Sequence, residues 1–129
     1  VKAMLDGEPV AINGDGETSR DFTFVDNVVQ ANLLAATVPE LADPSRVFNV
    51  AIGGQTSLNE LFAQIRTALT KVRPDLEIPD PVYRDFRAGD VRHSLADFSR
   101  AREELGFQPT HGLAEGLALA MEWYANEVG

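Results

Sequence analysis

Two short segments combine glycine with arginine in a way that suits the binding of an anionic ligand. The first is GDGETSRDFTFVDN, at positions 14–27. Its glycines permit a tight backbone turn, and Arg20 follows the polar part of that turn, where its side chain could project into a cleft. A hairpin turn with a surface arginine would use the same residues, so this segment alone leaves both interpretations open.

The second segment is RAGDVRHSLAD, at positions 87–97, where Arg87 and Asp90 flank Gly89. A guanidinium can hold phosphate oxygens in two-point contacts, and a neighbouring carboxylate can accept hydrogen bonds from ribose hydroxyls. A local salt bridge on a loop is the simpler alternative. The residue types therefore indicate a nucleotide site without requiring one.

The charge distribution favours a small anionic ligand over a polyanion. The chain has 11 basic and 20 acidic residues, a net charge of −9, which predicts repulsion from nucleic acid and from anionic membranes. Nine of the 11 basic residues are arginines, and five of them fall within 19 residues: Arg84, Arg87, Arg92, Arg100 and Arg102. A solvated surface of ion pairs would also explain this cluster.

Several other kinds of chemistry are not expected. Cysteine is absent, so disulfides and thiolate catalysis are excluded, and with only His93 and His111 no zinc site is expected. Neither histidine has a paired base or nucleophile in the sequence pattern, so both are interpreted as loop residues. No signal peptide or apolar run of about 20 residues is visible, which favours a cytoplasmic location.

The elements that must position these residues alternate between strand and helix, which indicates an α/β fold. We expect strands at 9–13, 21–25 and 47–52, and the tail of a helix at 1–7. Four further helices are expected: one capped by Asp26 and ending near Pro39, one opened by the capping box Ser57–Glu60, one from Asp97 to Gly106, and one after Pro109.

The predicted strand VFNVAI, at 47–52, has no obvious neighbours. Its nearly continuous apolar run is typical of a strand buried on both faces of a parallel sheet. The rest of the 129-residue sequence contains too few strands to flank it. This orphan strand predicts a missing partner domain or an intimate oligomer.

Five motifs together resemble one family over almost the whole chain. They are GDG-x-x-x-RDF-x-x-VDN, VFNVA-x-GG-x-TSL, R-x-GDV-x-x-S-x-AD, LGF-x-P and a final helix that carries Trp123. Their order and spacing are similar to the C-terminal portion of extended short-chain dehydrogenase/reductases of the NAD-dependent epimerase/dehydratase family, and most of all to UDP-N-acetylglucosamine 4-epimerases. The resemblance implies that residues 1–129 form the sugar-nucleotide-binding portion, with 47–52 belonging to a missing Rossmann sheet.

The same resemblance implies roles for eight residues. Arg20 and Arg87 would bind the diphosphate, and Asp90 would bind a ribose hydroxyl. Ser94, a small residue in the sugar pocket, would leave room for an N-acetyl group. The groups near the uracil and nucleoside would be Ala11, Ile12, Asn13 and Leu58.

The chain departs from the family pattern at the catalytic residues. The Gly-rich turn that holds NAD is absent, and Gly53-Gly54 is only a lone pair. The Tyr-x-x-x-Lys pair is absent too, because Tyr83 is followed four residues later by Arg87, and Tyr124 by Val128. We therefore expect no catalytic, NAD-binding or metal-binding residue in this chain, although the resemblance implies NAD in the parent enzyme.

Three functions stay open from the sequence. The chain could be the UDP-sugar-binding portion of an NAD-dependent 4-epimerase acting on UDP-N-acetylglucosamine or UDP-glucose. It could instead be a non-catalytic UDP-sugar-binding or assembly module, which would associate as a homo-oligomer through the orphan strand. Finally, it could be the same portion of a nucleotide-sugar dehydratase, reductase or decarboxylase.

Overall fold

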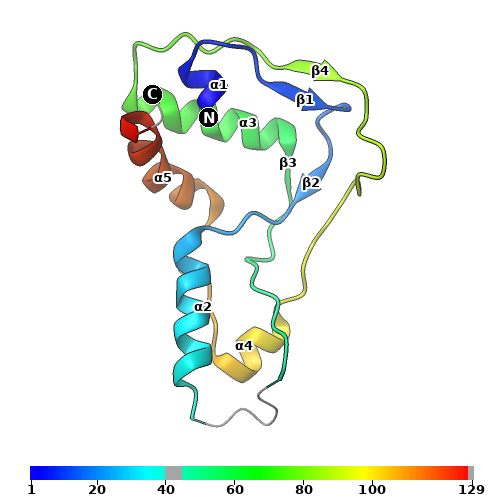
Figure 1. Ribbon diagram of the computed structural model, residues 1–129, viewed down its shortest axis with the longest axis vertical. Coiled ribbons are helices and arrows are strands. Elements are labelled where there is room, and N and C mark those ends of the chain that lie inside the picture. Colours follow the sequence, from blue (N-terminus) through cyan, green and yellow to red (C-terminus); the bar gives the residue numbers. More distant parts are fainter. Residues whose placement is uncertain (40–44, 128–129) are drawn as a thin grey trace.

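The computed structural model describes residues 1–39 and 45–127 of an elongated molecule (Figure 1). In chain order the elements are α1 (Lys2–Leu5), β1 (Ala11–Asn13), β2 (Ser19–Arg20), α2 (Val25–Thr37), β3 (Thr56–Ser57), α3 (Leu58–Val72), β4 (Val82–Arg84), α4 (Ser99–Leu105) and α5 (Leu113–Glu127). Within the described residues, β1 pairs with β4 in parallel and β2 pairs with β3 antiparallel. The predicted α/β class is confirmed.

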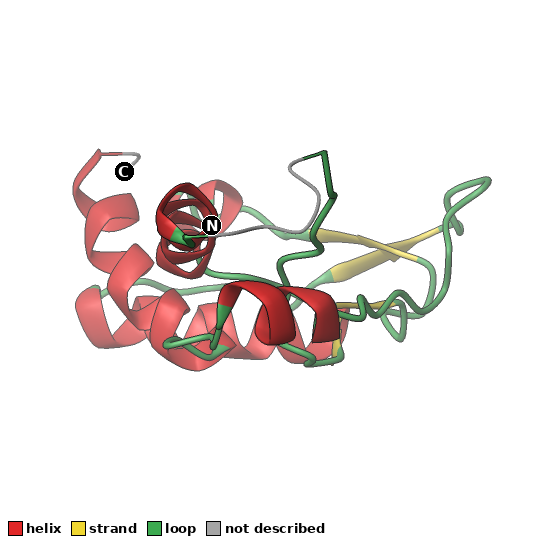
Figure 2. Cartoon of the chain, turned by 90° about the horizontal axis from the view of Figure 1, so that it is seen from below, coloured by secondary structure: helices red, strands yellow, loops and turns green. Residues whose placement is uncertain are grey.

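The first of two packed regions consists of α1, β1, α3, β4 and α5, and we call it the helix-pair region. Its core side chains are Met4, Ile12, Phe62, Leu69 and Met121. The apolar residues of α3 recur at helical spacing, so one face of α3 packs on α5 while its first half supports β1. Figure 2, seen from below, shows the helices gathered at one side of the molecule and the strands at the other.

The α3 helix begins where the sequence predicts. Ser57 is its N-cap, and its side-chain oxygen accepts a hydrogen bond from the backbone N–H of Glu60 (3.2 Å). The Glu60 carboxylate accepts in return from the backbone N–H of Ser57 (2.8 Å), which completes the capping box. The hydrogen bonds that the Glu60 carboxylate accepts from the backbone N–H and from the hydroxyl of Ser57 lower the pKa of Glu60.

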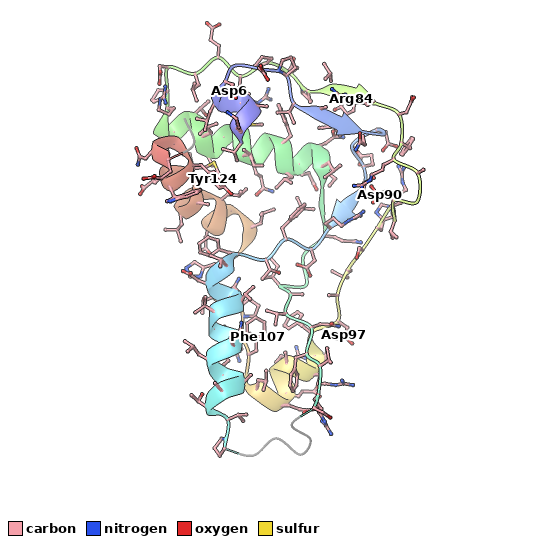
Figure 3. All side chains as sticks on the ribbon, viewed as in Figure 1. Asp6, Arg84, Asp90, Asp97, Phe107 and Tyr124 are labelled. Carbon is pink, nitrogen blue, oxygen red and sulfur yellow. The ribbon has the colours of Figure 1, made fainter. Side chains whose placement is uncertain are left out.

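The second region consists of α2, α4 and residues 46–52, and we call it the α2–α4 region. Its core is smaller, with Ala31, Ala101, Leu105 and Phe107. As expected, α4 is followed by Gly106 in the left-handed conformation (φ 69°), and the chain then turns back so that Phe107 is fully buried. Figure 3 shows Phe107 between α2 and α4.

A buried amide ties the two regions together. Asn27 on α2 is 0% exposed, and its Oδ1 accepts hydrogen bonds from the backbone N–H groups of Thr110 (2.9 Å) and His111 (3.2 Å). Its Nδ2 donates to the carbonyl of His111 (2.8 Å). Because Thr110 and His111 lead directly into α5, Asn27 fixes α5 relative to α2.

Three sequence predictions about local structure need correction. The predicted strand at 21–25 is displaced: β2 is Ser19–Arg20, residues 21–24 have no regular secondary structure, and α2 already begins at Val25. Phe24, not Asp26, is the N-cap of α2, and Asp26 lies exposed in its first turn. The N-cap of α4 is Phe98 and not Asp97, although the Asp97 carboxylate does accept a hydrogen bond from the backbone N–H of Ser99 (2.8 Å).

The stretch 47–52 forms no strand pairing with any described residue. Val47 is 78% exposed, whereas Ala51 is 2% exposed. A strand needs a neighbouring backbone for its hydrogen bonds, and the described part of the chain supplies none here. The segment is therefore an apolar, unpaired stretch, in agreement with its interpretation as an orphan strand.

Candidate functional site

Four of the predicted site residues line one cavity of about 200 Å³ between β1 and the first half of α3. They are Ala11, Ile12, Asn13 and Leu58, together with apolar side chains of α1 and α3. Ile12 is buried beneath the cavity, whereas Ala11 and Asn13 are exposed. The sequence therefore identified a set of residues that the fold does bring together.

The backbone of β1 has a free edge beside this cavity. Hydrogen bonds to β4 are made by residues on either side of Ala11 and Asn13: Val82 N–H donates to the carbonyl of Val10 (2.9 Å), and Gly14 N–H donates to the carbonyl of Arg84 (2.9 Å). Along a parallel strand, the backbone groups of every second residue face the same neighbour. Since Val10 and Gly14 bond to β4, the backbone groups of Ala11 and Asn13 face away from β4. Such an edge presents donors and acceptors to a planar ring.

Arg20 is held by acceptors from two segments of the chain. Its Nη2 lies 2.5 Å from Asp90 Oδ1, and its Nη1 donates to the carbonyls of Ser19 (2.7 Å) and Arg92 (3.4 Å). The Arg20 side chain keeps 29% of its surface exposed. The two motifs that the sequence singled out separately therefore meet, with Asp90 beside β2 (Figure 3).

Arg87 lies at the exposed turn that carries Asp90. The backbone N–H of Asp90 donates to the carbonyl of Arg87 (3.2 Å), and no ion pair or hydrogen bond joins the Arg87 guanidinium to another described residue. Its cationic group is free to meet an anion. Arg20 is fixed by protein acceptors, whereas Arg87 is available.

Ser94 lies beside β2, because its backbone N–H donates to the carbonyl of Ser19 (3.2 Å). The neighbouring His93, which the sequence suggested was only a loop residue, has its Nδ1 2.8 Å from Ser19 Oγ. Within the described residues the backbone hydrogen bonds here form an isolated bridge between Ser19 of β2 and His93. The Ser94 side chain is exposed.

The structure adds residues to the site that sequence reasoning missed. Asp15 in the GDG turn accepts a hydrogen bond from Arg92 Nη2 (2.7 Å), which is the main reason that the pKa of Asp15 is lowered. Asn59 on α3 donates to the carbonyl of Asp15 (3.1 Å) and accepts from the hydroxyl of Tyr83 (2.8 Å). Each lies within or next to a motif, but only the fold shows these contacts.

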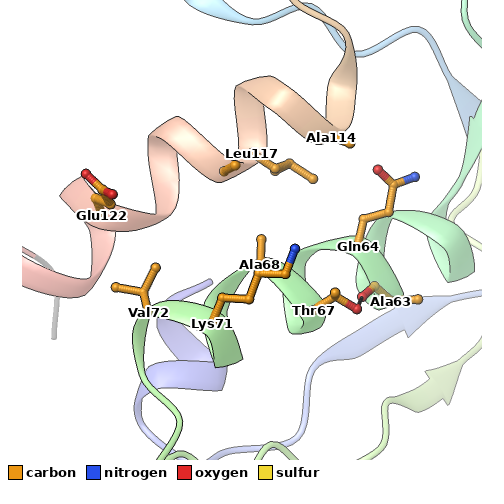
Figure 4. Close-up of a pocket in the computed structure, with 10 residues that line it drawn as sticks. Ala63, Gln64, Thr67, Ala68, Lys71, Val72, Ala114, Leu117 and Glu122 are labelled. Atoms are coloured by element: carbon orange, nitrogen blue, oxygen red, sulfur yellow. Dashed lines mark hydrogen bonds between the residues drawn. The ribbon is translucent and has the colours of Figure 1, made fainter.

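A larger cavity, of about 480 Å³, lies between α3 and α5, away from these residues (Figure 4). Its lining is mostly small or apolar, with Lys71 and Glu122 as its charged members. None of the eight predicted site residues lines it. Its chemistry does not match that of a nucleotide site, so we take the cavity at β1, together with Arg20 and Arg87, as the candidate site.

The Gly53-Gly54 pair does not fit the pyrophosphate of a dinucleotide. The backbone N–H groups of Ile52 and Gly53 already donate to the Asp21 carboxylate, at 3.3 and 2.9 Å. An anion placed there would meet a carboxylate of the same sign. Among residues 1–39 and 45–127, no group of three or more metal-ligating side chains occurs, and no helix is long and apolar enough to cross a membrane.

Comparison with known proteins finds similar sequences among nucleotide-sugar epimerases and dehydratases. Residues 1–51 match the sequence profile described as the NAD dependent epimerase/dehydratase family. The chain is 40% identical over 126 residues to a UDP-glucose 4-epimerase of Mycolicibacterium smegmatis, covering 98% of this chain and 37% of that protein. It is 35% identical over 128 residues to a dTDP-glucose 4,6-dehydratase of Haemophilus influenzae, covering 92% of this chain and 36% of that protein.

Solved structures of similar proteins superpose on nearly all of the chain. A UDP-glucose 4-epimerase of Thermotoga maritima with UDP-glucose has a TM-score of 0.79 and 41% identity over 99% of this chain and 38% of its own. A UDP-N-acetylglucosamine 4-epimerase of Methanobrevibacter ruminantium, in complex with UDP-N-acetylmuramic acid, has a TM-score of 0.78 and 36% identity. The match covers 95% of this chain and 36% of that protein.

A third structure contains both a nucleotide sugar and a dinucleotide. It is a UDP-glucuronic acid 4-epimerase of Bacillus cereus with UDP-glucuronic acid and NAD, with a TM-score of 0.79 and 26% identity over 99% of this chain and 38% of its own. This chain thus spans little more than a third of the length of the relatives that it matches. By profile, sequence and structure, it belongs to the NAD-dependent epimerase/dehydratase family, among the extended short-chain dehydrogenase/reductases.

Proposed function

We propose that this chain is the UDP-sugar-binding portion of an NAD-dependent nucleotide-sugar 4-epimerase that acts on UDP-N-acetylglucosamine or UDP-glucose. The observation that carries the proposal is the connection of the β1 cavity to Arg20. Ala11, Ile12, Asn13 and Leu58 line the cavity, and Thr56, two residues before Leu58, pairs with Arg20, which in turn pairs with Asp90. The cavity suits a uracil ring, and the arginine suits a diphosphate.

The binding roles divide between fixed and available groups. Arg20 would present its remaining N–H donors to the diphosphate from a side chain already oriented by Asp90 and two carbonyls. Arg87, exposed on its turn, would close on the same diphosphate. Asp90 would accept from a ribose hydroxyl, while Ser94 would leave space for the N-acetyl group.

We assign no chemical step to this chain. An epimerase of this family needs NAD to remove and return a hydride, and beside the Gly53-Gly54 pair the backbone N–H groups of Ile52 and Gly53 already donate to the Asp21 carboxylate. It also needs a tyrosine acid/base with a nearby lysine, and the sequence contains no Tyr-x-x-x-Lys pair. In our proposal both requirements are met by the part of the protein outside these 129 residues.

The first experiment is calorimetric titration of the full-length protein with UDP. Arg20→Ala and Arg87→Ala should each weaken binding by about 1.5–3 kcal/mol, because each removes a charge-assisted contact to phosphate. Arg73→Ala is a matched control, because Arg73 pairs with Asp75 on the surface, outside the cavity lining. Unchanged affinity in both test variants would reject this site.

The second experiment tests the reaction and the sugar. Full-length protein should interconvert the C4 epimers of UDP-N-acetylglucosamine or UDP-glucose, and turnover of neither would reject the epimerase assignment. Ser94→Tyr should lower kcat/KM for the N-acetylated substrate about tenfold or more relative to UDP-glucose, because the ring would fill the space of the acetyl group. An equal loss for both sugars would argue against Ser94 as the selecting residue.

A second reaction class deserves its own assay, because a dTDP-glucose 4,6-dehydratase is among the similar proteins. Incubation with dTDP-glucose and UDP-glucose, followed by detection of a 4-keto-6-deoxy product, would identify a dehydratase. A protein that binds UDP-sugars and turns over none of them would instead be a binding module.

A further inference from the structure

The loop that carries Arg87 and Asp90 is attached to the site at both ends. On one side, Gly14 N–H donates to the carbonyl of Arg84 (2.9 Å). On the other, Ser19 N–H donates to the carbonyl of Arg92 (2.8 Å). Residues 85–91 bridge these anchors and are exposed, so something other than burial must hold them in place.

Arg92 contacts both the loop and the turn opposite it. Its Nη2 donates to Asp15 Oδ2 (2.7 Å), and its guanidinium carbon lies 5.8 Å from the centre of the Phe86 ring. The Phe86 ring in turn lies so close to Gly14 that a Cβ there would come within 2.4 Å of it. Arg92 therefore connects Phe86, at the start of the loop, to the GDG turn.

We propose that Arg92 is a positioning residue that closes residues 85–91 against the GDG turn and thereby sets Arg87 and Asp90 for the nucleotide. This inference rests on the proposed function, since it concerns the same site. Arg92 itself faces Asp15 and Phe86, so it acts through these two residues. The loop then needs little further ordering when the ligand binds.

The main test is UDP affinity of the full-length protein carrying Arg92→Met, which keeps the aliphatic stem and removes the charge. We expect Kd to rise about three- to tenfold, since an exposed ion pair and a cation–π contact are lost together. The thermal midpoint should stay close to that of the unaltered protein, because the Arg92 and Asp15 side chains are 48% and 46% exposed. Arg100→Met, which removes the same charge elsewhere, should bind UDP normally.

Two further variants separate positioning from a general structural role. Asp15→Asn should weaken UDP binding in the same way, and combining it with Arg92→Met should add little, because both break one contact. Arg92→Lys should restore part of the affinity, since it keeps the charge. A normal Kd for Arg92→Met, or additive losses in the double variant, would overturn the proposal.

A measurement without ligand keeps the inference distinct from the proposed function. Limited trypsin digestion should cleave after Arg87 several-fold faster in Arg92→Met than in the unaltered protein, because the loop opens more often. Equal cleavage rates would overturn the positioning role. If the unaltered protein binds no UDP, the proposed function fails, while faster cleavage would still support the loop closure.

Discussion

The helix-pair region and the α2–α4 region differ in how far each completes its own packing. The first encloses five core side chains, among them Met4, Phe62 and Met121, between three helices and a strand. The second has four, and two of these are alanines, Ala31 and Ala101. The large side chain of Phe107 therefore supplies much of the apolar volume of the second core.

The outer surface of α2 sharpens this difference. Val25, Val29 and Leu33 are 60, 49 and 61% exposed, and next to α4 the same helix buries Ala31. A helix with apolar residues on two sides normally lies between two layers, and among the described residues α4 covers one side of α2. Together with the unpaired 47–52 stretch, this shows that the described residues leave one side of the α2–α4 region uncovered.

The largest effect should come from Phe107→Ala, which empties the centre of the smaller core. We expect a loss of about 3–5 kcal/mol in unfolding free energy, because a large cavity is left among small neighbours. Hydrogen exchange should accelerate in α2 and α4 before α3 and α5. Leu119→Ala, at a side chain that is 54% exposed, is the control and should change stability by about 0.5 kcal/mol or less.

Asn27→Ala tests the connection between the two regions. It leaves the backbone N–H groups of Thr110 and His111 without their acceptor, so we expect a loss of about 2–3 kcal/mol. Denaturant unfolding followed by probes in α2 and α5 should show the two regions separating. Coincident transitions with unchanged midpoints would mean that Asn27 does not couple them.

A smaller effect is expected at the capping box of the helix-pair region. Ser57→Ala should cost about 1 kcal/mol, as for other N-caps. The lowered pKa of Glu60 means that its stabilising effect is present above the ordinary carboxyl pKa and is lost as pH falls through the folded-state value. Glu60→Gln should therefore weaken the acid-induced fall in stability, measured as denaturation midpoints from pH 6 to pH 3.

The smallest effect should come from Val29→Asp in the isolated 129 residues. Its side chain is about half exposed there, so we expect a change of about 0.5 kcal/mol or less. In the full-length protein the same change should cost several kcal/mol if the α2 face is covered, because a carboxylate would be buried without a partner. Equal small changes at both lengths would show that the α2 face stays in solvent.

Much of the local structure could be predicted because it depends on neighbours in sequence. The capping box at Ser57 and Glu60, and the turn at Gly106 that buries Phe107, follow from backbone chemistry within a few residues. The predictions at Asp26 and 21–25 were wrong because strand and helix boundaries there depend on pairing with Ser57 and Thr56, which lie over 30 residues away.

For the site, the sequence by itself determined the residue types: two arginines, a carboxylate, and an apolar strand before a glycine turn. It also shows that no Tyr-x-x-x-Lys pair occurs among the 129 residues. Only the tertiary structure decided that Arg20 meets Asp90 and that Asp15 meets Arg92. These pairs join segments about 70 residues apart, and no local preference encodes such contacts, because they exist only once β2 and residues 92–94 lie side by side.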